Sequence, residues 1–359
     1  MGFVRRPISI FAAAEGFGFG PASKLVAIVR AMEAAPIRWT FASEGPGADM
    51  LEAEGYAVVR QAPHSAADVS QADVAIVAGS PEWARVLKDL MPTYFIDSLG
   101  FMWADVDKLD LEPVRDLTRY FAQDLFGSAL RLRELGVRNV HPVSGIVEPW
   151  PVRSEGAMND TVLSLGGVVN PFTDASVQTY INFVARIAEG ETAKRRSVRV
   201  LMSKTATATF EWYGPGTPSS LSKSAMRRAM NTTVRFAASP GLTTLVEAAS
   251  FGKLPVPLPP QNWSQVMICR QMAKICGEGL WAYLADLYGG LSSEMGETAG
   301  VAAVKQLNNT ILRDETVSAR ICAYLDLPQS AASIRDKLGA PFSGAAECTT
   351  RILTDLGLR

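Results

Sequence analysis

Short apolar runs alternate with longer amphipathic segments through the first half of the chain. We expect strands at residues 8–14, 37–42, 74–78, 94–96, 119–122 and around 143–147, because these runs have the length and composition of buried strands. Helices are expected between them, at residues 22–32, 48–54, 82–90 and 128–135. In residues 22–32, for example, Leu25, Ile28, Val29 and Met32 repeat at helical spacing. The alternation of strand and helix predicts a doubly wound parallel sheet.

The pattern breaks at residues 148–160, where two prolines and a glycine interrupt both the strand pattern and the helical pattern. We interpret this stretch as a linker. Beyond it the alternation restarts. Strands are expected at residues 161–165, 198–202, 234–237 and 256–258, and helices at 177–187, 223–230, 243–251 and 264–275. From residue 301 onward the chain has a helical pattern throughout. The sequence therefore predicts two α/β domains, at residues 1–150 and 161–359, with the last helices free to pack back on the first domain.

Composition and charge narrow the classes of function. The net charge of −1 argues against a broad basic surface for nucleic acid. No apolar run reaches the roughly 18 residues of a membrane span, and the N-terminal apolar run ends in Glu15 and glycines, as a first strand would. These features favour a cytoplasmic protein. Four cysteines without a CxxC pair, and only two histidines, predict reduced thiols and no metal site.

The segment 239–259 is the most informative one for chemistry. It follows a predicted strand, Gly241 permits a tight turn, and Thr243 and Thr244 can cap and open a helix. The first N–H groups of a helix form a ready anion site. Glu247 lies one turn further along on the same face, within reach of a ligand at that end. The alternative interpretation is an ordinary strand–helix unit with a well-capped helix.

This segment resembles the donor-binding signature of GT-B glycosyltransferases. The matching residues are Gly241-Leu242-Thr243-Thr244-Leu245-Val246-Glu247-Ala248-Ala249, followed by Gly252-Lys253 and Pro255. In that family a small-residue loop and helix hold the nucleotide diphosphate, and a glutamate holds the ribose. The resemblance implies donor-binding roles for Ser239, Gly241, Leu242, Thr243, Thr244 and Glu247. It also implies that Gln261 faces the sugar and that Gly166 and Gly167 approach the phosphates.

The family's fold is two Rossmann-like doubly wound domains that face each other across a cleft, and both halves of this chain fit it. In the first half, the loop Gly18-Phe19-Gly20-Pro21-Ala22-Ser23-Lys24 is similar to the GxGHxxR loop near the acceptor in many such enzymes. The resemblance implies that Gly18, Phe19 and Gly20 bind the acceptor. Pro21 stands where that loop has a histidine, which is a candidate general base. A glycine turn that lets strand and helix pack closely is the alternative.

A substitute base is therefore needed for a hydroxyl acceptor. Ligands of open parallel sheets lie at the carboxyl ends of the strands, and two acids are expected there. Glu15 ends the first strand, and Asp97 ends the strand at 94–96 and precedes an aromatic loop. We take Asp97 and Glu15 as the candidate catalytic residues. Lys204, after the strand at 198–202, is a candidate partner for phosphate. The aromatic segment 210–216 either stacks on a nucleobase or forms a loop packed by its own rings.

Together these features predict a metal-independent glycosyltransferase of the hexosyltransferase type. It would move a sugar from a nucleoside-diphosphate sugar, such as a UDP-sugar, to a hydroxyl or amine of a small-molecule or other acceptor, without a cofactor. Three alternatives remain: a nucleotide-sugar 2-epimerase of the same fold, a sugar-nucleotide binding protein that has lost its base, and a dinucleotide-dependent oxidoreductase. The glycine spacing 16, 18 and 20 disfavours the last of these.

Overall fold

The computed structural model describes residues 6–63, 69–103, 111–151, 158–169 and 176–358. The chain forms two compact units, and each has its own parallel sheet. Unit 1 comprises Met1–Pro149 together with Gly339–Arg359, and unit 2 comprises Trp150–Leu338. Within the linker expected at 148–160, residues 152–157 lie outside the described part of the chain.

Unit 1 is built on a seven-stranded parallel sheet with the order β3-β2-β1-β4-β5-β6-β7. The strands are β1 (Ile8–Ala14), β2 (Ile37–Ser43), β3 (Val58–Arg60), β4 (Val74–Ala78), β5 (Thr93–Asp97), β6 (Arg119–Gln123) and β7 (Val140–Val143). Parallel pairing needs a crossover between consecutive strands, and helices provide it. The sheet is doubly wound, because β1 and β4 are neighbours while β2 and β3 extend the opposite edge.

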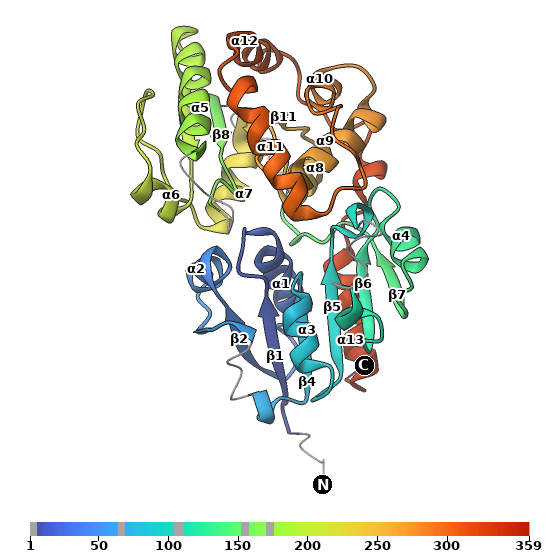
Figure 1. Ribbon diagram of the computed structural model, residues 1–359. Helices are drawn as coiled ribbons and strands as arrows, with labels where there is room; N and C mark the ends of the chain where they lie inside the picture. The colour runs from blue at the N-terminus through green and yellow to red at the C-terminus, as the bar shows by residue number, and fades with distance from the viewer. Residues whose placement is uncertain (1–5, 64–68, 104–110, 152–157, 170–175, 359) are drawn as a thin grey trace. The chain divides into compact units, whose positions relative to one another are not determined.

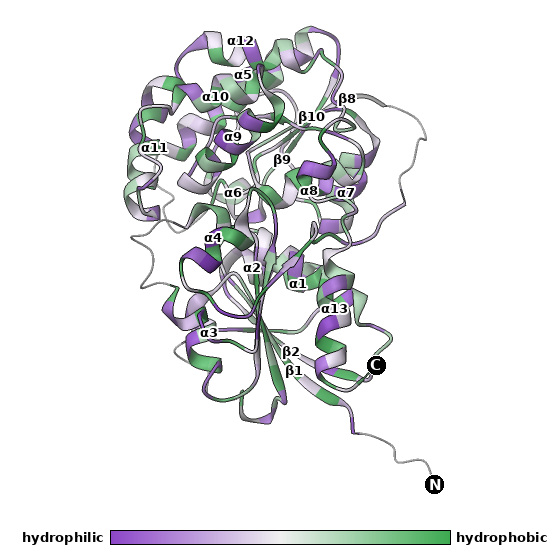
Figure 2. Cartoon of the chain, turned by 90° about the vertical axis from the view of Figure 1, so that its right-hand side faces the viewer, coloured by the Kyte–Doolittle hydropathy of each residue, from purple (hydrophilic) through white to green (hydrophobic). Residues whose placement is uncertain are grey.

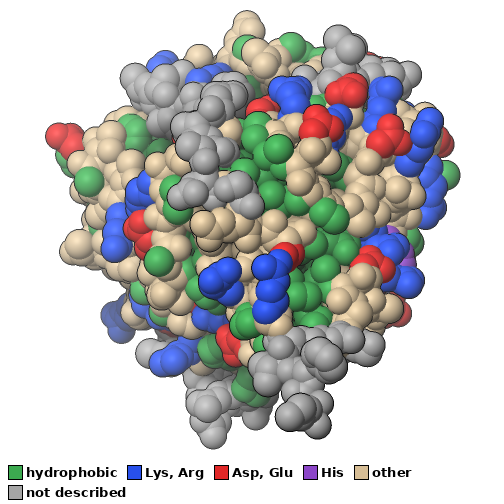
Figure 3. All heavy atoms as spheres, turned by 90° about the horizontal axis from the view of Figure 1, so that it is seen from below, with side chains coloured by type: hydrophobic (Ala, Val, Ile, Leu, Met, Phe, Trp, Pro, Cys, Tyr) green, Lys and Arg blue, Asp and Glu red, His purple; other side chains and the backbone are tan. Residues whose placement is uncertain are grey.

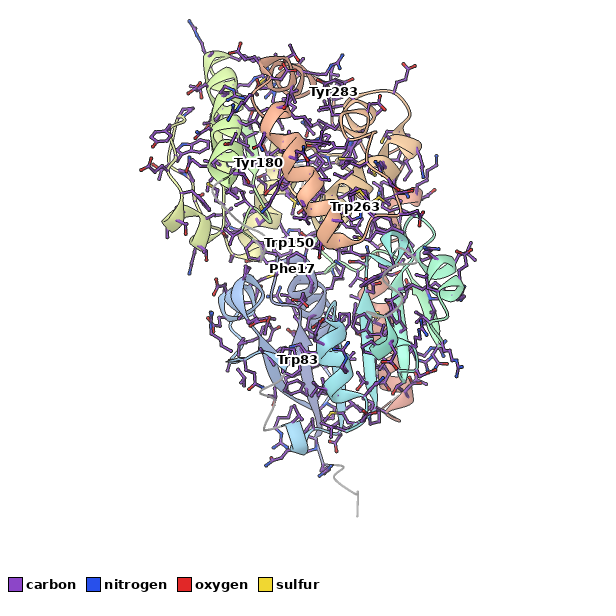
Figure 4. All side chains as sticks on the ribbon, viewed as in Figure 1. Phe17, Trp83, Trp150, Tyr180, Trp263 and Tyr283 are labelled. Carbon is purple, nitrogen blue, oxygen red and sulfur yellow. The ribbon has the colours of Figure 1, made fainter. Side chains whose placement is uncertain are left out.

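Helices cover both faces of this sheet (Figure 1). They are α1 (Gly20–Ala31), α2 (Gly45–Ala53), α3 (Pro81–Leu87), α4 (Ser128–Glu134) and α13 (Gly344–Asp355). Alternate residues of β1 point to opposite layers: Ile10 and Ala12 pack with α1 and α13, whereas Phe11 packs with α3. Trp83 of α3 anchors that second layer, with its ring centroid 5.3 Å from that of Phe11 (Figure 4). Both layers are thus dry cores of the kind expected for a parallel sheet.

The last helix belongs to unit 1 although it comes after all of unit 2 in the sequence. In Figure 2, α13 shows hydrophobic and hydrophilic bands along its length, and its apolar residues Cys348 and Ile352 join the α1 layer. Two glycines allow the segment that leads into α13 to pass close to the backbone at residues 144 and 145. A Cβ on Gly344 would lie 2.3 Å from the Ser144 carbonyl oxygen, and one on Gly339 would lie 2.9 Å from the Gly145 nitrogen.

Unit 2 contains a four-stranded parallel sheet with the order β11-β10-β8-β9. Its strands are β8 (Met158–Ser164), β9 (Ser197–Leu201), β10 (Thr233–Ala238) and β11 (Val256–Pro257). Its helices are α5 (Ser176–Ala193), α6 (Lys204–Thr209), α7 (Lys223–Thr232), α8 (Leu242–Ser250), α9 (Trp263–Cys276), α10 (Leu280–Leu287), α11 (Glu297–Ile311) and α12 (Glu315–Tyr324). On β8, Val162 packs into the α7–α8 layer, whereas Thr161 hydrogen-bonds to Glu191 of α5 on the other face.

The structure departs from the predicted elements in several places, which include the unpredicted helices α6 and α10. The expected strand around 143–147 is β7, which ends at Val143, and the chain beyond it runs alongside Gly339 and Gly344 instead. The short edge strand β3 was not predicted, because three residues are too few to show the alternation of apolar and polar positions that marks a strand. The C-terminal region is not helical throughout, because α12 ends at Tyr324 and α13 begins only at Gly344.

Charged side chains of both signs are interspersed on the face shown in Figure 3, and neither sign forms a continuous field there. Every helix in the described part of the chain is too short or too polar to cross a membrane.

Candidate functional site

The candidate donor segments of unit 2 meet where the winding of its sheet reverses. β8 and β10 are neighbours, although the chain passes through β9 between them. Gly166 and Gly167 follow β8, and Ser239 follows β10. The Ser239 N–H donates to the Ser164 carbonyl across 3.1 Å, which ties the two strand ends together. Open parallel sheets bind ligands beyond the carboxyl ends of strands at such a switch point.

Helix α8 starts at this point with Gly241 as its N-cap, so no side chain caps it. The expectation that Thr243 and Thr244 cap the helix is therefore wrong, because both lie within its first turn, after Leu242. The first bond within the helix runs from the Leu245 N–H to the Gly241 carbonyl, at 2.9 Å. The N–H groups in the first turn of a helix point toward its start, and this is the geometry that favours an anion.

The glycines of these segments serve different purposes. Gly167 has a φ of +82°, a conformation that favours glycine. Gly241 has a φ of −89°, and a Cβ added to it would come no closer than 3.8 Å to another atom. A Cβ on Gly166 would likewise meet only the Ser164 Oγ, at 3.9 Å. Among the described residues of unit 2, the fold therefore leaves open space at Gly241 and Gly166 and requires a glycine at neither position.

Two charged residues of the signature lie in unit 2, where Glu247 is buried and Lys253 is half-buried. Glu247 lies on α8 one turn beyond Thr243, and its side chain is buried. The Lys253 ammonium donates to the backbone carbonyls of Met230, Asn231 and Thr233, at the end of α7. Lys253 thus satisfies the last carbonyls of that helix and joins it to the α8–β11 turn.

Gln261 is held by a chain of hydrogen bonds that begins on α5. The Tyr180 hydroxyl donates to the Pro259 carbonyl (3.0 Å) and lies 3.2 Å from the Ser239 Oγ. The Gln261 Nε2 lies 2.5 Å from the same Ser239 Oγ. Tyr180 and Ser239 are both buried (Figure 4 labels Tyr180). Sequence reasoning missed Tyr180, since no local pattern connects it with residue 239 or 261.

A second glutamine joins the two donor segments. The Gln265 Oε1 accepts a hydrogen bond from the Gln261 N–H at 2.8 Å. Its Nε2 lies 3.6 Å from the position of a Cβ on Gly167. Gln265 was not predicted either, although a second glutamine one helical turn after Gln261 is a sequence signal that could have identified it.

A hollow in unit 2 opens beside Gln261, and we call it the α5–α11 hollow. Its lining combines amide, hydroxyl and aliphatic groups from the start of α5 and the end of α11. The lining residues are Val168, Ser176, Val177, Thr179, Tyr180, Gln261, Lys305, Asn308, Asn309 and Leu312. Asn308 is part of its scaffold, because its side chain accepts from the Tyr288 hydroxyl and donates to the Pro260 carbonyl. Gln261 therefore connects this hollow with the donor segments.

The remaining predicted residues of unit 2 lie around the end of β9. Lys204 is exposed on the first turn of α6, which Ser203 caps. In the aromatic segment, Trp212 folds over Gly214, where a Cβ would lie 2.6 Å from the indole. The Trp212 Nε1–H also donates to the Gly216 carbonyl at 3.1 Å. These contacts favour a loop packed by its own ring, and Tyr213 is the ring left exposed.

In unit 1, Glu15 lies at the corresponding switch point, between β1 and β4. Its N–H pairs with the Ala78 carbonyl of β4, and the Gly16 N–H donates to its Oε1 at 3.0 Å. Burial raises the pKa of this carboxyl above its ordinary value; a hydrogen bond with Ser80 lowers it in part, and the charge of Glu82 raises it. A partly buried carboxyl with a raised pKa at a switch point has the features of a general base.

Asp97 has different surroundings. Its carboxylate accepts hydrogen bonds from the Tyr120 hydroxyl (2.6 Å), the Leu99 N–H (2.7 Å) and the Trp103 Nε1–H (3.3 Å). The side chain is buried in unit 1. Three donors around one buried carboxylate favour a structural role, so Glu15 is the acid that we retain as the candidate base.

The glycine loop after β1 has both structural and open positions. A Cβ on Gly16 would lie 3.0 Å from the Glu44 carbonyl oxygen, so Gly16 allows this loop to approach the β2–α2 turn. Gly18 has a φ of +74° and open space around it. Phe19 is the N-cap of α1, and Gly20 begins that helix. The loop reaches the carboxyl end of β1, where an acceptor-binding role for Gly18, Phe19 and Gly20 remains a prediction.

Comparison with known proteins identifies the fold. No family model matches the sequence, and no curated protein is similar to it in sequence. A Listeria monocytogenes protein assigned as a UDP-N-acetylglucosamine 2-epimerase superposes with a TM-score of 0.52 at 10% identity, over 98% of this chain and 97% of that one. Another UDP-N-acetylglucosamine 2-epimerase gives 0.50 at 10% identity, over 98% of both chains. The glycosyltransferase of kitacinnamycin gives 0.47 at 12% identity, over 97% and 99%.

These similarities extend over nearly the full length of both partners, and they confirm the predicted fold class. The chain has two α/β units with parallel sheets, and its structural neighbours have the GT-B fold.

Proposed function

We propose that this protein is a glycosyltransferase that moves a sugar from a nucleoside-diphosphate sugar to a hydroxyl or amine acceptor. The observation that carries the proposal is the meeting of two donor segments at the switch point of unit 2. Gly166 and Gly167 follow β8, and the segment from Ser239 to Thr244 follows the neighbouring β10. Together they place glycine backbone beside the start of α8, and this combination suits a diphosphate.

In this mechanism the start of α8 and the backbone at Gly166 and Gly167 stabilise the charge that grows on the leaving diphosphate. The protein's own N–H groups and the helix dipole do this work, so the proposal includes no metal and no cofactor. Glu247 is assigned to the ribose and Gln261 to the sugar. Exposed Lys204 is assigned to attracting the phosphates before they bind.

Glu15 is the proposed general base. Its raised pKa makes it a stronger proton acceptor than an ordinary carboxylate. It would take the proton from the acceptor hydroxyl as the oxygen attacks the anomeric carbon. The acceptor is assigned to unit 1, beside the loop Gly18-Phe19-Gly20.

The test begins with a panel of nucleoside diphosphates measured by calorimetry. We expect one of them, with UDP as the first choice, to bind with micromolar affinity, and the Gly241→Ala variant to weaken that binding by about 10-fold or more. The matching sugar nucleotide is then incubated with a library of hydroxyl and amine acceptors, and diphosphate release is followed. Absence of binding by every nucleoside diphosphate would remove the proposal.

A nucleotide-sugar 2-epimerase is the second candidate, because two solved structures with TM-scores of 0.50 and 0.52 carry that name. The two activities separate in a reaction without acceptor. An epimerase converts UDP-N-acetylglucosamine to its 2-epimer under these conditions, whereas a glycosyltransferase needs the acceptor for turnover. Detection of the 2-epimer by NMR in the acceptor-free reaction would favour the second candidate.

A further inference from the structure

The hydrogen bonds around Tyr180 have only one consistent direction. The Pro259 carbonyl can only accept, so the Tyr180 hydroxyl, 3.0 Å away, must donate to it. Burial raises the pKa of Tyr180, so the phenol keeps its single proton. With that proton committed to Pro259, Tyr180 can only accept from Ser239, at 3.2 Å.

The same reasoning determines the orientation of Gln261. The Ser239 hydroxyl has one proton, and Tyr180 takes it. The Ser239 Oγ can then only accept a hydrogen bond from the group 2.5 Å away on Gln261. That group must therefore be the amide nitrogen, since the amide oxygen cannot donate. The Gln261 Oε1 consequently points away from Ser239.

We propose that Tyr180 and Ser239 are positioning residues, which hold the Gln261 side chain so that it presents its carbonyl oxygen to the α5–α11 hollow. Gln261 lines that hollow, so the ligand group that it meets there is a hydrogen-bond donor, such as a sugar hydroxyl. This assignment rests on the proposed function and refines it. Ser239 contributes through Gln261, not by contact with the diphosphate, because a phosphate oxygen would need its single proton, which it donates to Tyr180 within unit 2.

Calorimetry with UDP and UDP-N-acetylglucosamine tests the proposal on Tyr180→Phe, Ser239→Ala and the double variant. Each single variant is expected to weaken UDP-N-acetylglucosamine binding by about 3- to 10-fold and to leave UDP binding within about 2-fold, since one hydrogen bond to the sugar is misplaced. The double variant should lose no more than the stronger single variant, because both changes break one chain. Equal losses for UDP and UDP-N-acetylglucosamine, or additive losses, would overturn the proposal.

Tyr283→Phe is the matched control. It makes the same chemical change in unit 2, on α10, where the Tyr283 ring packs against the Arg320 guanidinium at 4.1 Å (Figure 4). This variant should bind both ligands as the wild type does. Thermal unfolding of all four variants separates loss of positioning from loss of fold.

A measurement without ligand keeps the proposal independent of the proposed function. The Gln261 side-chain amide signal is assigned in the ¹⁵N–¹H spectrum by its loss in Gln261→Glu. In Tyr180→Phe and Ser239→Ala its hydrogen exchange should accelerate by about 10-fold or more, because the amide is no longer held. An unchanged exchange rate in both variants overturns the proposal. If the wild type binds none of the nucleoside diphosphates in the panel, the proposed function fails, and this measurement still decides the orientation of Gln261.

Discussion

Glu15 and Asp97 both stand at the carboxyl ends of buried strands of unit 1, yet their surroundings suit different tasks. Three donors hold the Asp97 carboxylate inside the unit. Burial and the charge of Glu82 raise the pKa of Glu15, and the donors near it only partly offset them. At the scale of the residue, partners and solvation decide which carboxyl is available for proton transfer.

Glu15→Gln should therefore reduce turnover by about 100-fold or more while sugar-nucleotide binding persists, because a positioned base contributes about that much. In the wild type, kcat/KM should rise with pH through a pKa above 4.5, since the base must lose its proton and its pKa is raised. Steady-state kinetics across the acidic range measures both effects. Asp97→Asn is the control and should lower stability instead. Full turnover in Glu15→Gln would exclude this base.

Gly241 offers a test of ligand approach that leaves the fold intact. Its φ of −89° suits alanine, and the added Cβ meets nothing within 3.8 Å. Gly241→Ala should keep the melting temperature of the wild type and weaken UDP binding by about 10-fold or more, because the Cβ occupies the ligand's space. The comparison is Gly252→Ala, where φ is +79°. That variant should lose about 1 kcal/mol of stability and retain binding. Normal UDP binding in Gly241→Ala would place the diphosphate elsewhere.

At the scale of the element, α13 depends on a close passage of backbone. Gly344 has no room for a side chain, since a Cβ would lie 2.3 Å from the Ser144 carbonyl oxygen. Gly344→Ala should therefore cost about 1–3 kcal/mol of unfolding free energy, as overpacking does. Chemical denaturation measures the loss. Gly357→Ala, at a φ of +65° with open space, controls for strain without a clash. Equal losses in the two variants would contradict the packing argument.

The same helix carries an acid that should make stability depend on pH. The Ser144 and Ser343 hydroxyls and the Ser144 N–H donate to Glu347, and they hold its pKa below 4.5 although burial acts in the opposite direction. Between that lowered pKa and 4.5 the unfolded chain binds more protons than the folded one. The stabilisation is thus complete above pH 4.5 and is lost as the pH falls through the folded-state pKa.

Glu347→Gln should lower the free energy of unfolding at pH 7 by about 1–3 kcal/mol, the range for hydrogen bonds to a charged group. It should also flatten the decline in stability below pH 4.5. Urea denaturation of both proteins between pH 7 and pH 3.5 measures the two slopes. Parallel pH profiles would show that Glu347 does not contribute to this dependence.

At the scale of the whole molecule, the proposed function divides the chemistry between the two units. Unit 2 carries the donor segments at its β8–β10 switch point, and unit 1 carries Glu15 at its β1–β4 switch point. UDP should therefore slow backbone hydrogen exchange at residues 166–168 and 239–247 by about 10-fold or more, and leave residues 15–20 unchanged, because a ligand stabilises the part that it contacts. Mass spectrometry of exchange with and without UDP tests this. Protection confined to unit 1 would reverse the assignment of donor and acceptor.

Much of the fold was predictable because its signals are local. β1 and β4 have the predicted bounds, since continuous apolar runs bounded by glycine and acidic residues mark buried parallel strands. α8 ends at Ser250, and Gly252 follows its C-cap with a φ of +79°, as expected for a glycine that terminates a helix. The predicted start of α8 was wrong in detail. Either threonine after the glycine could have been the N-cap on sequence grounds, whereas the N-cap in the structure is Gly241.

The sequence by itself determined the alternation of strands and helices, and with it two parallel sheets and the segment from Ser239 to Glu247 beside a strand end. These follow from periodicity and from the restricted backbone of glycine and proline, which act over a few residues. Only the tertiary structure decided that Tyr180 hydrogen-bonds to Ser239, that the Tyr120 hydroxyl donates to Asp97, and that α13 packs in unit 1. Those partners are distant in the chain, and their contacts exist only once the strands have paired and the helices have packed.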